Sequence, residues 1–353
     1  TGSVPFRTLI IASGATDRIM PLPGWTLPGV YSLGGAQIAL KAQACAIGAR
    51  PVFLGTGPLL YLVAWQYAKA GVAVQAVLDT SSLARRLRAL RDLAARPAVL
   101  ARGIRYTAAL LRRGIAVRTG ITPLAVEGEG RAAAVVWRDK AGREHRTACD
   151  ALGLGYGLRS ETQLADLAGC RFGFDPVARQ WLPDLDADGR STVPGIYLAG
   201  DGALVRGADA AELAGRLAAC AALGDLGLPV EAAETVRLRH ALATMTRFRR
   251  GLEQGFPWPA QLATDLPDET IVCRCEAITA GELRRAGRDL AAPEVNRAKA
   301  FSRVGMGRCQ GRMCGLAAAE ILAATRGEPV EAVGRLRSAA PLKPLPVADE
   351  VEA

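Results

Sequence analysis

The sequence has few aromatic residues and few lysines. Only 5% of its 353 residues are Phe, Trp or Tyr, which disfavours a single-stranded nucleic-acid platform built on stacked rings. Half of the residues are hydrophobic and 22% are charged, so disorder and collagen-like repeats are disfavoured as well. The formal net charge is +10, but no DNA- or RNA-binding motif accompanies it. We therefore predict a globular protein without a nucleic-acid partner.

Residues suited to acid–base or disulfide chemistry are also scarce. The two histidines, His145 and His240, lie in polar, strand-like or helical segments, and we expect both at the surface. No Cys-x-x-Cys pair occurs in the nucleotide-binding part of the chain, which disfavours a disulfide reductase. We therefore predict that the chain contains no catalytic residue and that cofactors carry its chemistry.

No long apolar run interrupts the chain. The most apolar stretch, residues 51–67, contains Gly55, Gly57 and Pro58, which predicts a strand, a turn and a helix and no transmembrane segment. The chain has eight cysteines, too few for a disulfide scaffold of this size. Four of them stand alone: Cys45, Cys149, Cys170 and Cys220. We interpret these four as small buried residues of a protein in a reducing compartment, and we expect a cytoplasmic location.

Short apolar runs alternate with helical patterns in the first part of the chain, which is the rhythm of βα units on a parallel sheet. A β-meander over the sheet and further helices follow. The expected elements are strands at 8–13, 51–54, 73–78 and 150–153, helices at 35–47, 59–70, 208–222 and 229–253, and the meander at 116–147. This pattern predicts an α/β protein with Rossmann-like parallel sheets.

Arginines alternate with leucines and alanines between residues 82 and 113. The spacing predicts two amphipathic helices that are broken near Pro97. Their basic side chains form either a solvated face or a docking surface for an acidic subunit.

The other four cysteines form two close pairs, Cys273-Arg-Cys275 and Cys309-Gln-Gly-Arg-Met-Cys314. Four thiolates bind zinc or an iron–sulfur cluster. Structural zinc sites prefer two to four residues between both pairs of cysteines, so a one-residue gap combined with a four-residue gap favours a [2Fe–2S] cluster.

The residues around these cysteines support the same assignment. Glycines let the backbone approach closely enough to donate N–H groups to cluster sulfurs. Those glycines are Gly305, Gly307, Gly311 and Gly315. Helical spacing resumes at Leu316, which places Cys314 near a helix N-terminus, where the helix dipole favours an anionic group.

Two motifs carry flavin signals. The segment Ile10-Ile-Ala-Ser-Gly-Ala-Thr16 resembles the strand and turn that link the FAD and NAD(P) domains of two-dinucleotide-binding flavoproteins. The segment Gly195-Ile-Tyr-Leu-Ala-Gly-Asp201 resembles the later FAD motif of the same class. The resemblance implies an FAD contact for Asp201 at the ribityl–pyrophosphate region, where a carboxylate accepts a hydroxyl hydrogen. The other residues that it implies at the FAD are Ala12, Gly14, Ala15, Thr16, Gly200 and Gly202.

A third motif, Val52-Phe-Leu-Gly-Thr-Gly-Pro-Leu-Leu60, reads as a strand, a Gly-x-Gly turn and a helix. It resembles a Rossmann loop, with Gly55 and Gly57 at a pyrophosphate and Asp79 at the end of the next strand, suitably placed for a ribose hydroxyl. Leu60 occupies the position of the third glycine, which argues against NAD(P)H. Two alternatives stay open: a bound adenine nucleotide, NAD(P) or ATP, and a vestigial empty loop.

The first Gly-x-Gly-x-x-Gly fingerprint of an FAD domain should precede Thr8 and does not occur, so we expect that the N-terminal part of this domain is missing. A Pro-rich stretch separates the nucleotide-binding part from the clustered cysteines. The expected domains are an FAD-binding-type domain at 1–34 and 115–255, an inserted Rossmann-like domain at 35–114, a linker at 256–269, a [2Fe–2S] domain at 270–326 and an extended tail at 327–353.

Residues 270–325 closely resemble the bacterioferritin-associated-ferredoxin type of [2Fe–2S] domain. The whole chain resembles one family on the order of its modules and on the segments Pro23–Gly29, Gly153–Gly157 and Gly305–Cys314. That family comprises the larger subunits of opine oxidase, hydrogen cyanide synthase and the heteromeric proline or hydroxyproline dehydrogenases. The resemblance implies FAD, a [2Fe–2S] cluster and a separate subunit of the amino-acid-oxidase type that oxidises the amine.

Three hypotheses for the function follow. The leading one is an electron-transfer subunit of an amino- or imino-acid dehydrogenase. Its partners are the amine-oxidising flavoprotein subunit, optionally a small third subunit, and a downstream electron acceptor. The second is a self-contained NAD(P)H-dependent reductase that uses Gly55 and Gly57. The third is a non-catalytic iron–sulfur interaction module.

Overall fold

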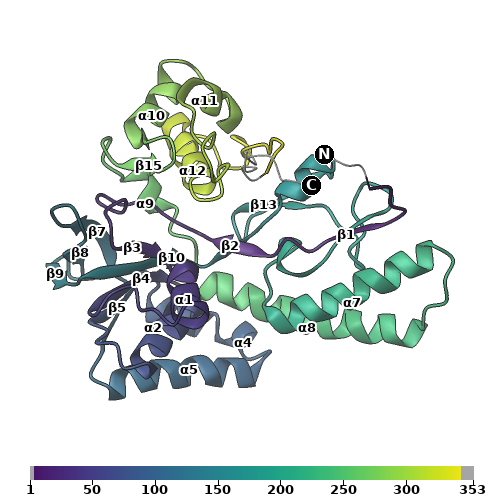
Figure 1. The fold of residues 1–353 in the computed structure, drawn as a ribbon, viewed down its shortest axis with the longest axis horizontal. Helices are drawn as coiled ribbons and strands as arrows, with labels where there is room; N and C mark the ends of the chain where they lie inside the picture. The colour runs from purple at the N-terminus through teal and green to yellow at the C-terminus, as the bar shows by residue number, and fades with distance from the viewer. Residues whose placement is uncertain (1–3, 343–353) are drawn as a thin grey trace, which may run out of the picture.

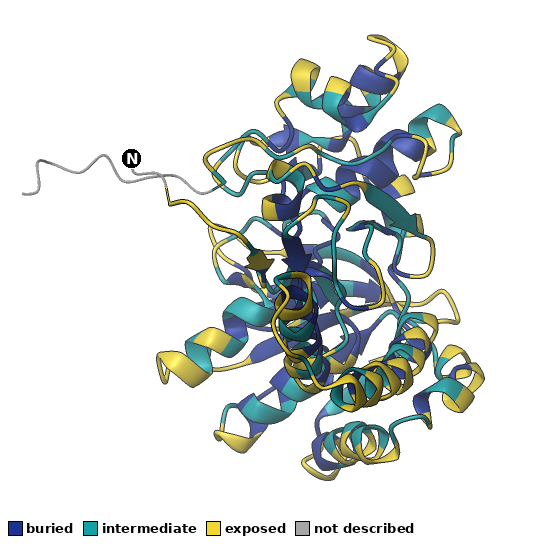
Figure 2. Ribbon diagram, turned by 90° about the vertical axis from the view of Figure 1, so that its right-hand side faces the viewer, coloured by how far each residue is buried: buried dark blue, intermediate teal, exposed yellow. Residues whose placement is uncertain are grey.

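The structure is a computed structural model that describes residues 4–342. Figure 1 shows three groups of elements: a sheet with its helices, a long pair formed by α7 (Ala208–Asp225) and α8 (Ala232–Gly255), and a small group that contains α10 to α12. Exposed residues lie mainly on the outer faces of helices, whereas the sheet is buried (Figure 2). Within residues 4–342, every helix is too short or too polar to cross a membrane.

A five-stranded parallel sheet forms the centre of the first group, with the strand order β3-β10-β4-β5-β6. Its strands are β3 (Val30–Ser32), β4 (Pro51–Thr56), β5 (Ala76–Asp79), β6 (Ala116–Thr119) and β10 (Ala151–Tyr156). Every residue of β4, β5 and β10 is buried, because both faces of such a sheet are covered. The predicted α/β class is confirmed.

Three helices cover one face of this sheet: α1 (Leu33–Ala42), α2 (Pro58–Lys69) and α5 (Pro97–Arg112). Phe53 and Val77 point into this core. The neighbouring residue Val52 points to the other face, where it belongs to a core that includes Trp137. Alternation along each strand therefore separates the helical layer from a second layer.

That second layer is a three-stranded antiparallel meander. Its strands are β7 (Thr122–Glu127), β8 (Ala134–Arg138) and β9 (Glu144–Ala148), as predicted except that β6 joins the parallel sheet. Because β6 pairs with β5 and β10 pairs with β4, the sheet crosses the boundary that we expected at residue 114. The unit that the sheet defines extends from residue 30 to residue 156.

The arginine-rich segment forms three helices where two were expected. α3 (Leu83–Arg88) and α4 (Leu90–Leu93) meet at Ala89, and α5 begins at Pro97. Proline is favoured at a first helical position because its missing N–H has no intrahelical partner there. Ala89 packs against Phe248 of α8, so this segment is attached to the long helix pair.

Besides the helix pair, the second group contains three two-stranded sheets. These are the parallel pair β1 (Leu9–Ile11) and β14 (Ile196–Leu198), and the antiparallel pairs β2 (Ala15–Asp17) with β11 (Leu158–Ser160) and β12 (Phe172–Asp175) with β13 (Gln180–Pro183). The short helix α6 (Gln163–Leu167) follows β11. β2 and β11 lie at the junction with the parallel sheet, because β11 directly follows β10 along the chain.

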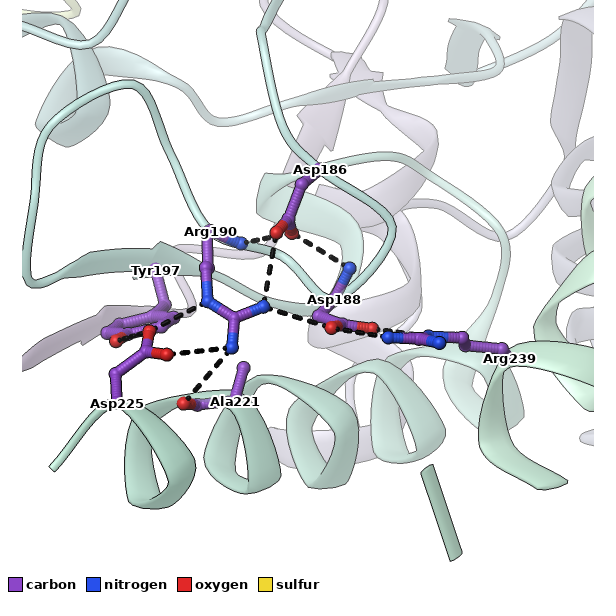
Figure 3. A network of polar contacts seen from close by, with 7 residues as sticks. All are labelled: Asp186, Asp188, Arg190, Tyr197, Ala221, Asp225 and Arg239. Carbon is purple, nitrogen blue, oxygen red and sulfur yellow. Dashed lines mark hydrogen bonds and ion pairs between the residues drawn. The ribbon is translucent and has the colours of Figure 1, made fainter. Parts of the chain in front are cut away.

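A charged network attaches β14 to the helix pair (Figure 3). Arg190 Nε lies 2.7 Å from Asp225 Oδ2 on α7, and Tyr197 on β14 donates to the same carboxylate oxygen at 2.6 Å. Asp188 joins Arg190 at 2.9 Å and receives two bonds from Arg239 on α8. The Asp225 carboxylate raises the pKa of Arg190. The network fixes β14, at whose end lies the predicted FAD motif.

The small group contains the clustered cysteines. Its elements are β15 (Ile271–Cys273), β16 (Ile278–Thr279), α10 (Ala280–Arg288), α11 (Val295–Ser302) and α12 (Gly315–Arg326). Thr279 and Glu282 form a capping box at the start of α10, which satisfies two backbone donors there. Seven consecutive residues of α12, from Ala317 to Ala323, are buried, so this helix is the centre of the group.

The segments on either side of this group are more ordered than we expected. Residues 256–269 were expected to form a linker, but they contain α9 (Gln261–Thr264), and Trp258 is buried with its Nε1 3.2 Å from Glu320 Oε1 of α12. The tail expected at 327–353 folds back over residues 327–336, where Val333 is fully buried. Residues 343–353, including most of the Pro341–Pro346 stretch, lie outside the described residues.

The turn at Gly24 provides a test of the packing between the segment that precedes β3 and the meander. A Cβ atom on Gly24 would lie 2.0 Å from the carbonyl oxygen of Val126, and its φ of +77° disfavours other residues. We expect Gly24→Ala to destabilise the protein by about 3 kcal/mol in urea unfolding, from strain and overlap together.

Gly130→Ala is the matched control for this substitution. Its φ of +66° is also positive, but no atom lies within 4 Å of the new Cβ, so we expect a loss of only about 1 kcal/mol. Equal losses for the two variants would contradict the close packing at Gly24.

Candidate redox site

The two predicted flavin motifs lie side by side although they are far apart in the sequence. Ile11 of β1 pairs with Leu198 of β14, and Ala199 N donates to Ile11 O at 3.0 Å. A Cβ atom on Gly202 would lie 2.6 Å from Ser13 Oγ and 3.2 Å from Gly14 N. Gly202 therefore permits the two turns to touch, and the ends of parallel strands are where α/β folds bind ligands.

Asp201 is oriented by its own turn. Its Oδ1 accepts the backbone N–H groups of Arg206 and Gly207 at 3.0 and 3.2 Å. Its Oδ2 has no hydrogen-bond donor among residues 4–342, and the side chain is partly exposed. A free carboxylate oxygen at this strand end suits a ligand hydroxyl, so the residues present fit the ribityl–pyrophosphate part of FAD.

The other predicted FAD residues surround the same turns. Gly200 has a φ of +65° and Gly14 a φ of +77°, and a Cβ on Gly14 would meet no atom within 4 Å. Ala12 is exposed, while Ala15 and Thr16 belong to β2 and pair with Ser160 and Arg159. Gly14 and Ala12 thus face open space beside Asp201's turn, whereas Ala15 and Thr16 lead towards β11.

The predicted Rossmann loop forms a strand, a turn and a helix, as expected. A Cβ on Gly55 would lie 1.6 Å from the carbonyl oxygen of Gly155, so the neighbouring strand alone already requires a glycine there. Gly57 precedes α2 with a φ of +101°. Leu60 is fully buried in the core, where it fills the space that a third glycine would leave to closer helix–strand packing.

Asp79 differs from our expectation. Its carboxylate is fully buried and accepts hydrogen bonds from Thr56 Oγ1, Tyr61 OH and Ser81 N, and it pairs with Arg86 at 2.6 Å. Burial raises the pKa of Asp79, and the Arg86 guanidinium opposes that shift. Both oxygens are used by the protein itself, so the ribose contact predicted for Asp79 is not available in this conformation.

The four clustered thiols lie together at the start of α12. Cys314 faces both Cys273 and Cys309, and its thiol lowers the pKa of each by hydrogen bonding while its own pKa rises. Cys275 donates to Cys309, and burial is the main cause that raises the pKa of Cys275. Cys314 is also the N-cap of α12, as predicted from the helical spacing.

Backbone groups complete this donor set. N–H groups of Gly305 and Glu276 point to the Cys273 sulfur, and those of Met313 and Gly311 point to the Cys309 sulfur. Among residues 4–342 no three potential ligands converge on one ion position. The thiols instead form a series of contacts, from Cys273 to Cys314, from Cys314 to Cys309 and from Cys309 to Cys275. Four thiols with N–H donors directed at their sulfurs fit a [2Fe–2S] cluster by the chemistry of the donors.

Close packing explains the glycines of the cysteine loop. A Cβ on Gly307 would lie 2.3 Å from the Cβ of Cys275. Cβ atoms on Gly305 and Gly311 would lie 2.6 and 2.7 Å from Leu336 Cδ1. The folded part of the tail therefore covers the loop, and larger residues at these positions would displace either Cys275 or Leu336.

The cysteine loop docks directly onto the flavin motifs. Arg312 Nε donates to Glu161 Oε2 at 2.7 Å, and Gln163 Nε2 donates to the carbonyl oxygen of Gln310 at 2.7 Å. Glu161 in turn donates its N–H to Gly14 O, and Ser13 Oγ donates to Glu161 O. A continuous chain of contacts thus leads from the Gly14 turn to the loop between Cys309 and Cys314.

Sequence reasoning missed this docking set. Glu161 and Gln163 follow the Gly153–Gly157 motif closely, but Glu161 meets Arg312 across 151 positions of the chain. A charge pair with that separation leaves no periodic or motif signal. The eight cysteines are unpaired; Cys149 and Cys170 are buried as expected, Cys220 is partly buried, and Cys45 is exposed, contrary to expectation.

Comparisons with known proteins agree with this arrangement. Residues 1–221 match the family described as pyridine nucleotide-disulphide oxidoreductase, and residues 271–324 match the BFD-like [2Fe-2S] binding domain. An opine oxidase subunit from Agrobacterium tumefaciens (strain Ach5) is 41% identical over 98% of this chain and 69% of its own length. The chain belongs to the family of this opine oxidase subunit. It is a flavin oxidoreductase with an FAD-binding domain and a [2Fe–2S] domain.

Other proteins that are similar to this chain agree with that family. The corresponding opine oxidase subunit of Rhizobium meliloti is 40% identical over 97% of this chain and 65% of that protein. Hydrogen cyanide synthase subunit HcnB of Pseudomonas aeruginosa is 33% identical over 97% of this chain and 75% of that protein. The crystal structure of L-proline dehydrogenase from P. horikoshii shares the fold, with a TM-score of 0.67 at 19% identity, over 96% of this chain and 57% of that one.

The Glu161–Arg312 pair predicts how firmly the cysteine domain is held. Both side chains are largely buried, at 10% and 15% exposed, and neutralising one partner of a buried pair costs about 3 kcal/mol. We expect Glu161→Gln to increase hydrogen–deuterium exchange in a peptide that contains residues 310–316.

Glu276→Gln is the matched control for that variant, because Glu276 also pairs with an arginine, Arg303, but one that is 65% exposed. Such pairs contribute less than about 1 kcal/mol, and we expect no change in exchange at 310–316. Unchanged exchange in Glu161→Gln as well would contradict a docking role for the buried pair.

The buried position of Asp79 predicts that its replacement lowers the free energy of unfolding. Replacing it with Asn removes the charge that faces Arg86 and leaves an amide N–H₂ beside donors, so we expect Asp79→Asn to lower the free energy of unfolding by about 3 kcal/mol. Tyr61→Phe removes only one of the donors to Asp79 and should cost about 1 kcal/mol. Urea unfolding measures both, and a cost for Asp79→Asn no larger than that for Tyr61→Phe would contradict this view of Asp79.

Proposed function

We propose that the chain is the electron-transfer subunit of a heteromeric flavin-dependent amino- or imino-acid dehydrogenase. The observation that carries the proposal is the docking of the cysteine loop onto the flavin motifs through Glu161 and Arg312. FAD supplies two-electron chemistry and a [2Fe–2S] cluster one-electron chemistry. The residues of this chain hold the two sites side by side in a largely buried boundary.

Each proposed cofactor site has its own set of residues. We propose that Asp201 Oδ2 accepts a hydroxyl hydrogen of FAD, with Gly14 and Gly202 leaving room at the two strand ends. The further FAD contacts that we propose are Ala12, Ala15, Thr16 and Gly200. The proposed cluster ligands are Cys273, Cys275, Cys309 and Cys314, whose sulfurs already face one another in pairs.

The amine is oxidised, in this proposal, on a partner. The names of the relatives describe subunits of opine oxidase and of hydrogen cyanide synthase, which supports a partner subunit here. We propose an amino-acid-oxidase-like flavoprotein as that partner, optionally a small third subunit, an opine, proline, hydroxyproline or glycine-type substrate, and a separate electron acceptor. The free cysteines support a cytoplasmic location.

A self-contained NAD(P)H-dependent reductase is the second candidate. The strand, glycine turn and helix at Gly55–Gly57 favour it, because such a loop accepts a pyrophosphate at the helix N-terminus. The buried Asp79 and the buried Leu60 argue against NAD(P)H. An adenine nucleotide, NAD(P) or ATP, is the proposed ligand if the loop is occupied, and a vestigial empty loop is the alternative.

The relay is tested by replacing a proposed cluster ligand in the complex. We expect Cys309→Ser, co-purified with the amine-oxidising subunit, to lower the amine-dependent reduction of an external dye more than tenfold. Reduction of the partner's flavin by the amine should persist, because that step does not use this chain. L-Proline, hydroxyproline, glycine and an opine serve as amine probes.

Cys220→Ser is the matched control, since Cys220 is a partly buried lone cysteine of α7, and it should leave dye reduction unchanged. Full dye reduction by the Cys309→Ser complex would overturn the relay. Bleaching of the bound flavin by NADH in the absence of any partner would favour the reductase instead.

A further inference from the structure

Arg159 on β11 brings a positive charge to the cysteine loop. Its Nη1 donates to the carbonyl oxygen of Arg312 at 3.4 Å. The same Nη1 lies 3.9 Å from the position that a Cβ on Gly315 would occupy. Gly315 directly follows Cys314 and is the first residue of α12. The guanidinium group therefore lies beside the ligand at the centre of the thiol group.

The other arginines at this boundary have carboxylate partners, and Arg159 has none within 4 Å among residues 4–342. Arg179 pairs with Glu320 at 2.7 Å and Arg335 with Asp166 at 2.6 Å. Arg312 takes the Glu161 carboxylate at 2.7 Å. Desolvation lowers the pKa of Arg159, yet a guanidinium stays charged in proteins. Arg159 is thus a cation in a boundary that screens charge poorly, and the carboxylate that acts on it from beyond 4 Å, that of Glu161, is already bonded to Arg312.

A cluster with four thiolate ligands provides a counter-ion for Arg159. Such a cluster is anionic, and it gains one more negative charge when it accepts an electron. A fixed positive charge nearby attracts the reduced form more strongly than the oxidised form, and the attraction is larger where water is excluded. A nearby cation therefore raises the reduction potential of the cluster.

We propose that Arg159 is the fixed counter-charge of the cluster and raises its reduction potential. The cluster ligands belong to residues 273–314 and Arg159 belongs to β11, so the potential depends on docking of the cysteine domain. Gln163 and Glu161 maintain that docking through Gln310 and Arg312. Arg159 acts on the cluster through its charge and is not one of its ligands. The inference rests on the cluster of the proposed function but not on the partner subunit.

The test uses the purified, cluster-loaded chain without any partner. The midpoint potential of the cluster is measured by redox titration, with the EPR signal of the reduced state as the readout. Arg159→Gln should lower the equilibrium constant for cluster reduction at least tenfold, a shift of about 59 mV to more negative potential for one electron. Arg159→Lys retains the charge and should stay within about threefold of the wild type.

Arg308→Gln is the matched control. Arg308 is adjacent to Cys309 in sequence but exposed to water, which screens its charge, so its replacement should change the constant less than about threefold. An unchanged potential in Arg159→Gln, or equal shifts in Arg159→Gln and Arg308→Gln, would overturn the proposal.

If Arg159→Gln does not bind the cluster, cluster content in further Arg159 variants tests the proposal. Arg159→Met preserves the length of the side chain without its charge, and iron content and visible absorbance report the cluster. Loss of the cluster in the Gln and Met variants with retention in Arg159→Lys would support the need for the charge. Loss in all three would contradict it. None of these outcomes depends on amine oxidation, so they are independent of the relay test.

Discussion

The ion pair between Glu161 and Arg312 is the contact on which the arrangement of the site depends. Glu161 is fastened to the Gly14 turn by backbone and hydroxyl contacts, and Arg312 lies between two of the clustered cysteines. Because both side chains are largely buried, either one without the other would be an uncompensated charge. The pair therefore specifies one position of the cysteine loop against the strand ends of the flavin motifs.

The nucleotide-binding unit has a different design. Its glycine turn is present, but Gly55 is required by the neighbouring strand and Asp79 is enclosed by Thr56, Tyr61 and Arg86. Hydrogen bonds inside a low-dielectric core are strong, and both oxygens of Asp79 are satisfied here, whereas Arg86 Nε has no partner among residues 4–342. The unit thereby acts as a rigid support that carries β10 and β11 to the flavin motifs and the cysteine loop.

Local signals in the sequence predicted much of this molecule. Alternating apolar runs predicted β4 and β5, and the two cysteine pairs with their glycines predicted the four thiols that meet at α12. Features that depend on distant partners were not predictable. The burial of Asp79 follows from Arg86 and Tyr61 folding over it, the sheet crosses residue 114 because β6 pairs with β5, and Leu336 folds back onto glycines that it does not neighbour in sequence.

Direct electron transfer requires that one chain holds the flavin and the cluster close together. Stopped-flow reduction of the flavin in the purified, flavin- and cluster-loaded protein, followed by freeze-quench EPR of the cluster, tests it most directly. We expect the cluster to become reduced at a rate independent of protein concentration, because the two sites belong to the same docked molecule. A rate proportional to protein concentration, or a cluster that stays oxidised, would contradict it.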